Sequence, residues 1–134
     1  MKPASDLLMR GLKMNGIFSA LSAIAMLLGA NWLAEQVGLP GPANVYAVAI
    51  FLLFFAAQLR NIVRTGKIRS WEIIGIIAGD FLWVAGSVVL GALYFRSFST
   101  IGALLVDAAA IAVLLFAIMQ IRGLREHRRN AYSQ

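Results

Sequence analysis

The sequence predicts an all-α fold, a polytopic membrane protein whose four transmembrane helices form one bundle. Hydrophobic residues make up 60% of the 134 residues and charged residues only 13%, which lies outside the usual range of a water-soluble domain. Four apolar segments also reach about 20 residues each, the length that an α-helix needs to cross a bilayer. We therefore expect one transmembrane domain over residues 1–134.

The four predicted helices cover residues 14–33, 43–63, 73–95 and 100–121, and a short basic tail follows at 122–134. The first helix ends before residues 35–42, where two prolines and two glycines stop one helix and delay the next. Residues 64–70, three of them basic, separate the second helix from the third, and residues 96–99 separate the third from the fourth. None of these connections is long enough to hold a soluble domain.

Basic residues predict the orientation. Eleven of the twelve Lys and Arg residues lie at the N-terminus, in the middle connection or at the C-terminus: Lys2, Arg10, Lys13, Arg60, Arg64, Lys67, Arg69, Arg122, Arg125, Arg128 and Arg129. A four-span layout places these three regions on one side, and only Arg96 on the other. The positive-inside rule puts that side in the cytoplasm, so we expect a multi-pass protein of a bacterial-type inner membrane with both termini cytoplasmic.

The first apolar segment has a second interpretation. Basic residues followed by an apolar run that ends near Gly29 are also typical of a secretory signal peptide. Because the run is long enough to span a bilayer, we favour a permanent helix.

Several function classes lack a basis in this sequence. There is no cysteine, so thiolate metal sites and thiol nucleophiles are excluded. His127 is the single histidine and stands in the basic tail, so we expect no metal site and no cofactor. The basic residues border apolar spans rather than forming a basic face, so we expect no nucleic-acid partner. No catalytic motif is present, and we expect no enzyme and no catalytic residue.

An offset of 62 residues aligns the chain with itself. It pairs residues 28–32 with 90–94, and residues 52–60 with 114–122, without a gap. These matches favour an internal repeat of two helical hairpins related by an axis along the membrane normal. Frequent Ala, Leu and Gly also raise the number of chance matches.

Glycines of the third helix predict close helix packing. Gly75 and Gly79 form a GxxxG pair, and Gly86 and Gly91 continue the series of small residues. Such residues let helix backbones approach closely in lipid, so we expect them to pack helices within the bundle. The alternative is that some of them face a ligand groove or a second subunit. A homo-oligomer or a larger membrane complex is therefore expected, in a bilayer whose anionic headgroups contact the basic tail.

Asp80 and Asp107 are the two carboxylates placed well inside apolar spans. Each costs a few kcal/mol there unless it is protonated, paired or in contact with water. Counted from the helix midpoints, their depths differ by roughly 11 Å. This separation disfavours a shared proton or a shared metal ion and favours two successive ligand positions.

Register suggests neighbours for both acids. Counting along the predicted helices places Arg60, Gln58 and Ser19 at the depth of Asp80. Ser87 lies close to the depth of Asp107, and Trp83 lies between the two acids. The candidate ligand-binding or ion-binding set is therefore Asp80, Asp107, Trp83, Ser87 and Arg60. Gln58, Gln120, Arg60 and Arg122 also fit the membrane interface, where long polar side chains reach for headgroups. We interpret Gln120 as such an anchor.

Two function hypotheses remain. One is a small transporter or binding protein for a small cation, a proton or a cationic, lipid-like solute that uses the intramembrane carboxylates. The other is a non-catalytic accessory subunit that packs against a larger membrane complex. A purely structural role for both aspartates, as hydrogen-bond partners of neighbouring helices, also stays open.

The predicted orientation can be tested with a reporter protein that fluoresces only in the cytoplasm. Fused after Gln134, it should be bright, because eleven of twelve basic residues favour that side. A dark fusion, together with an active periplasmic reporter at the same position, would contradict the topology.

Overall fold

The computed structural model describes residues 6–94 and 96–132, and these form five helices. They are α1 (Asp6–Leu28), α2 (Ala30–Gln36), α3 (Ala43–Thr65), α4 (Ser70–Tyr94) and α5 (Thr100–Tyr132). All except α2 are long and apolar enough to cross a membrane, and no strand occurs in the described part of the chain. The predicted all-α fold with four spans is confirmed, and the chain is a multi-pass membrane protein.

Several helix boundaries differ from the expected ones. The expected helix at 14–33 is divided at Gly29 into α1 and α2, and α4 begins at Ser70 rather than residue 73. Helix α1 begins eight residues earlier, at Asp6 rather than residue 14, and α5 continues through the basic tail to Tyr132. The expectation followed hydropathy, which falls where charged residues begin. Helical hydrogen bonding does not stop there, because Arg, Glu and Leu are good helix formers. Lys2, Phe95 and residues 133–134, which were included in the predictions, lie outside the described residues.

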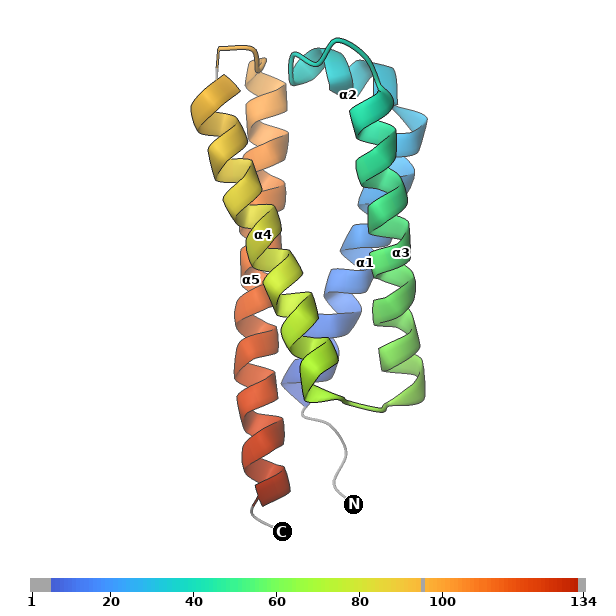
Figure 1. Ribbon diagram of the computed structural model, residues 1–134, viewed down its shortest axis with the longest axis vertical. Coiled ribbons are helices and arrows are strands. Elements are labelled where there is room, and N and C mark those ends of the chain that lie inside the picture. The colour runs from blue at the N-terminus through green and yellow to red at the C-terminus, as the bar shows by residue number, and fades with distance from the viewer. Residues whose placement is uncertain (1–5, 95, 133–134) are drawn as a thin grey trace.

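The helices form two hairpins, α1–α2–α3 and α4–α5, that stand side by side (Figure 1). Helix α1 packs against both α3 and α5, and α4 packs against α5. In the described chain the backbones of α3 and α4 do not come into contact, although their side chains meet near the connection between them. In a twofold repeat of the two hairpins, the contact between α1 and α5 would have a counterpart between α4 and α3. The described backbones show only the first of these contacts, and the internal repeat stays a prediction.

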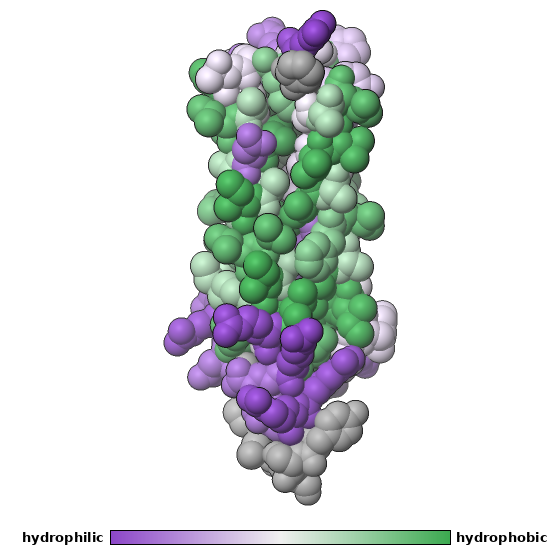
Figure 2. Space-filling model, turned by 90° about the vertical axis from the view of Figure 1, so that its left-hand side faces the viewer, coloured by the Kyte–Doolittle hydropathy of each residue, from purple (hydrophilic) through white to green (hydrophobic). Residues whose placement is uncertain are grey.

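The two ends of the bundle differ in charge. The start of α1, the end of α5 and the α3–α4 connection lie together at the lower end in Figure 1, and α2 and the α4–α5 connection lie at the other. We call the lower end the basic end, because ten of the twelve Lys and Arg residues are described there. The opposite one, with Arg96, is the far end. Figure 2 shows hydrophilic residues at both ends and a hydrophobic band between them, as expected for a protein surrounded by lipid.

The most tightly packed region lies at the basic end. There a set of buried aliphatic residues, the basal cluster, joins α1, α3, α4 and α5: Leu8, Leu12, Leu59, Ile62, Ile73, Ile76, Ile77 and Leu124. Helix α5 comes very close to α1 at Gly123, where an added Cβ atom would lie 2.5 Å from the backbone of Leu8. The basal cluster therefore closes this end of the bundle.

A second contact joins the hairpins at the far end. The backbone N–H of Ser99 donates to the carbonyl of Gln36 at 2.8 Å, and the hydroxyl of Ser99 also contacts the Gln36 side chain. Gly102 lies directly against the same carbonyl, without room for a side chain. Between these two contacts the hairpins separate.

The close approach at Gly123 predicts a specific sensitivity. Gly123→Ala should lower the free energy of unfolding by about 1–3 kcal/mol, because the methyl group forces α5 away from α1. Gly75→Ala is the matched control, since nothing lies within 4 Å of its added Cβ and both helices gain the same propensity. Thermal unfolding in detergent, followed by circular dichroism, measures both. Equal unfolding temperatures for the two variants would contradict the close contact.

Candidate functional site

Three polar side chains from three helices meet inside the bundle. Asn15 of α1, Asp80 of α4 and Gln120 of α5 are 1%, 3% and 0% exposed. We call them the polar triad. Ser19, one helical turn beyond Asn15, is buried beside them. These polar groups are surrounded by apolar residues of four spanning helices, so their hydrogen bonds have to come from one another.

Hydrogen bonds link each member of the triad to the other two. The Asn15 amide donates to the Asp80 carboxylate, at 2.9 Å to Oδ2 and 3.1 Å to Oδ1. The same amide nitrogen donates to Gln120 Oε1 at 3.0 Å. Gln120 Nε2 in turn donates to Asp80 Oδ2 at 2.7 Å. Ser19 extends the network, because its hydroxyl donates to Asn15 Oδ1 at 3.4 Å.

The Asp80 carboxylate has no cationic neighbour in this network. Its donors are the neutral amides of Asn15 and Gln120, and no Lys, Arg or His of the described chain forms an ion pair with it. A carboxylate buried in an apolar span is costly unless a positive charge or a proton accompanies it. The triad supplies hydrogen bonds to the Asp80 carboxyl group but no positive charge.

The triad lies at one end of a cavity of about 450 Å³. Asn15, Ser19 and Asp80 are among its lining residues, and the cavity continues from them toward Trp32 and Leu33 of α2 at the far end. Its walls come from all five helices and are almost entirely apolar. This volume is typical of pockets that bind small organic molecules.

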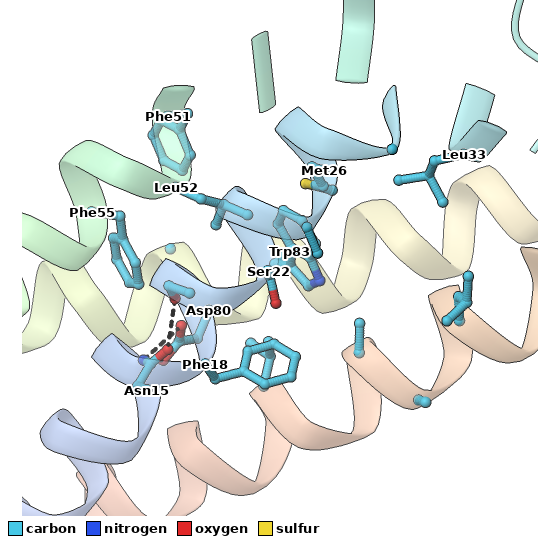
Figure 3. Close-up of a pocket in the computed structure, with 18 of the residues that line it drawn as sticks. Asn15, Phe18, Ser22, Met26, Leu33, Phe51, Leu52, Phe55, Asp80 and Trp83 are labelled. Carbon is cyan, nitrogen blue, oxygen red and sulfur yellow. Dashed lines mark hydrogen bonds between the residues drawn. The ribbon is translucent and has the colours of Figure 1, made fainter. Parts of the chain in front are cut away.

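Aromatic rings surround the triad end of the cavity. Figure 3 shows Phe18, Phe51, Phe55 and Trp83 around the space beside Asp80. Phe51 and Phe55 stack with ring centroids 6.3 Å apart, and Phe18 packs edge-on against Phe116 at 5.5 Å. These contacts hold the rings in place, and the faces of such rings attract cations.

Trp83 separates this cavity from a second one. The second cavity, of about 490 Å³, reaches Leu90 of α4 and shares five lining residues with the first: Met26, Leu33, Trp83, Leu105 and Ala109. The indole Nε1 of Trp83 is buried and has no hydrogen-bond partner in the described chain. In Figure 3 this nitrogen points to the same space as the Ser22 hydroxyl. It is a free donor at the border of both cavities.

The predicted ligand set is divided between different places. Trp83 borders both cavities, and Ser87 lines the second one while its hydroxyl donates to the Trp83 carbonyl at 2.8 Å. Asp107 is exposed on α5 and lines neither cavity. Arg60 is exposed on α3 and faces a different groove. Of the two acids, the structure places only Asp80 at the cavity.

The glycines of α4 make few contacts within the chain. An added Cβ atom would meet nothing within 4 Å at Gly75, Gly86 and Gly91, and at Gly79 it would lie 3.7 Å from the Phe55 ring. The helix backbones therefore do not approach closely at these positions, and Gly75 and Gly86 are exposed. Gly79 and Gly86 instead line the two cavities. The close approaches are at other glycines: Gly11, Gly16, Gly38, Gly102 and Gly123.

Asn15 and Gln120 are the site residues that the sequence analysis missed. Gln120 was interpreted as an interface anchor, which is wrong, because it is fully buried. The error follows from the helix boundaries: α1 begins before residue 14 and α5 continues past residue 121, so both amides lie deeper than expected. The available signal in the sequence was Asn15 itself, a polar residue four positions before Ser19 and therefore on the same helix face.

The described residues contain no group of three or more His, Cys, Asp or Glu that could hold a metal ion. No family model matches the chain, and neither a curated protein nor a solved structure shows significant similarity to it. The chemistry of the site therefore has to be inferred from its own geometry.

The hydrogen bonds of the triad predict a loss of stability when one amide is removed. Asn15→Leu should lower the free energy of unfolding by about 1–3 kcal/mol, because it leaves a buried carboxylate with fewer donors. Asn61→Leu is the matched control, since Asn61 is exposed on α3. Thermal unfolding in detergent compares the two variants. An Asn15→Leu protein as stable as the wild type would show that the triad adds nothing to the fold.

Proposed function

We propose that this protein binds an organic cation with apolar substituents in the cavity beside Asp80, as the binding step of a small transporter. The observation that carries the proposal is the Asp80 carboxylate, which is 3% exposed and bonded only to neutral amides. A cation in the cavity would supply the missing positive charge. The neutral amides of Asn15 and Gln120 would orient the Asp80 carboxylate toward the cation and would leave its negative charge available to that cation.

The lining of the cavity supports an organic cation rather than a metal ion. A metal ion requires several oxygen or nitrogen ligands, and Asp80 is the single carboxylate among the lining residues. Phe18, Phe51, Phe55 and Trp83 suit a quaternary ammonium or phosphonium group with apolar arms, which contacts ring faces and needs no hydrogen bonds. The free indole N–H of Trp83 could donate a hydrogen bond to a carbonyl or ether oxygen of such a ligand.

The packing differs between the two ends of the bundle, and this difference favours exchange of the ligand between the cavity and one membrane face. The basal cluster closes the protein below the triad, whereas the cavities continue to the far end. A ligand would enter from the far half of the membrane and reach Asp80 past Trp83. We propose that the basic end faces the cytoplasm of a bacterial-type cell, so that this entry lies on the outer side.

An accessory role is the second candidate, and a different observation favours it. Asp107 is exposed on a membrane-spanning helix, and Gly75 leaves an open surface on α4. A carboxylate that faces lipid is costly, and a neighbouring protein that covers it would remove that cost. A second copy of the chain or another membrane protein could occupy this surface.

The cation proposal predicts opposite results for the two aspartates. Asp80→Asn should weaken binding of tetraphenylphosphonium by at least tenfold, about 1.4 kcal/mol, because Asn preserves the volume and removes the charge. Asp107→Asn, the matched control, removes the same charge outside the cavity and should bind normally. Equilibrium binding to the purified protein measures both, and uptake into proteoliposomes should follow the same order.

Two results would overturn this proposal: no binding by the wild type, or equal binding by wild type and Asp80→Asn. The accessory role makes a separate prediction for a native pull-down from membranes. Asp107→Asn would then lose a co-purifying membrane protein that Asp80→Asn retains.

A further inference from the structure

A third hollow lies on the seam between α1 and α3. It is a groove of about 580 Å³ that shares no lining residue with the two cavities described above. It lies within one hairpin, whereas the cavities lie between the hairpins. Any ligand of this groove is therefore independent of the cation proposed for Asp80.

Three positive charges line the end of the groove that is nearer the basic end. They are Lys13 of α1 and Arg60 and Arg64 of α3, all exposed. Arg60 and Arg64 are four residues apart, so they stand one above the other on the same helix face. No acidic residue lines the groove, and none of the three cations has an ion pair or hydrogen bond within the described chain.

The rest of the groove is apolar. Four small residues line it, Gly16 and Ala20 of α1 and Ala56 and Ala57 of α3, together with the larger aliphatic residues Leu12, Ile17, Leu53, Leu59 and Val63. At Gly16 the two helices are close, since an added Cβ atom would lie 3.3 Å from the Cβ of Leu59, and the small residues leave a shallow apolar channel along the rest of the seam. From Arg64 to Leu53 the groove follows α3 for eleven residues, about 16 Å at 1.5 Å per residue. It therefore joins a cationic pocket at the membrane interface to an apolar channel inside the membrane.

We propose that this groove is a binding site for one anionic phospholipid. The headgroup phosphate lies among Lys13, Arg60 and Arg64, and one acyl chain lies in the channel beside Gly16, Ala20 and Ala57. Arg binds phosphate oxygens in bidentate fashion and Lys adds a point charge. Basic pockets between membrane helices are a known form of recognition for anionic headgroups. The combination of charge and channel distinguishes this site from the general attraction of a basic surface to lipid.

Native mass spectrometry of the detergent-solubilised protein tests the site with phosphatidylglycerol and phosphatidylcholine of identical chains. The wild type should retain one phosphatidylglycerol in preference to phosphatidylcholine. Arg60→Gln with Arg64→Gln should weaken phosphatidylglycerol binding by at least tenfold. The matched control, Arg125→Gln with Arg128→Gln, removes the same charge from exposed positions of α5 outside the groove and should bind as the wild type does.

A second pair of variants tests the acyl chain. Ala57→Phe fills the channel from an exposed position and leaves all charges in place, so it should weaken binding severalfold. Ala47→Phe is its control, since Ala47 is exposed on the same helix and does not line the groove. Full binding by Ala57→Phe would reduce the site to a phosphate contact and overturn the proposal. Equal losses in the two arginine pairs, or equal binding of the two lipids, would overturn it as well.

Discussion

The buried carboxylate of Asp80 is the constraint on which the arrangement of the bundle depends. Because it is 3% exposed and surrounded by apolar residues, its hydrogen bonds have to come from other helices. Asn15 and Gln120 supply them from α1 and α5, and the triad thereby joins the two hairpins at one level. Apolar packing alone favours no such register, because lipid tails are as apolar as the side chains they would replace.

The packing on either side of the triad is unequal. On the side of the basic end the basal cluster brings together all four spanning helices, and Gly123 lets α5 lie against α1. On the other side α3 and α4 diverge until Gln36 and Ser99 join the hairpins at the far end. The cavity is the space between these two contacts. Its position beside the buried Asp80 carboxyl group makes it the best candidate for binding a cation in the described chain.

The two proposed sites use opposite charges on different seams. Between the hairpins a single carboxylate lies among aromatic rings, which suits a cation. Between α1 and α3 three cations border an apolar channel, which suits an anionic lipid. Helix α1 contributes to both, through Asn15 on one face and Lys13 and Gly16 on another. A lipid in the groove would therefore contact the helix that positions the triad.

The number of spans follows from the sequence alone, because hydrophobic length and charge clusters are local properties of the chain. It also identified Asp80 and Trp83 as unusual, since polar groups in apolar segments carry a cost wherever they pack. Which of the two acids is buried depends on the tertiary structure: Asp80 meets two amides inside the bundle, whereas Asp107 is exposed. The partners Asn15 and Gln120 are 65 and 40 residues from Asp80. Their meeting depends on how far each helix continues and how it rotates, and hydropathy carries no information on either.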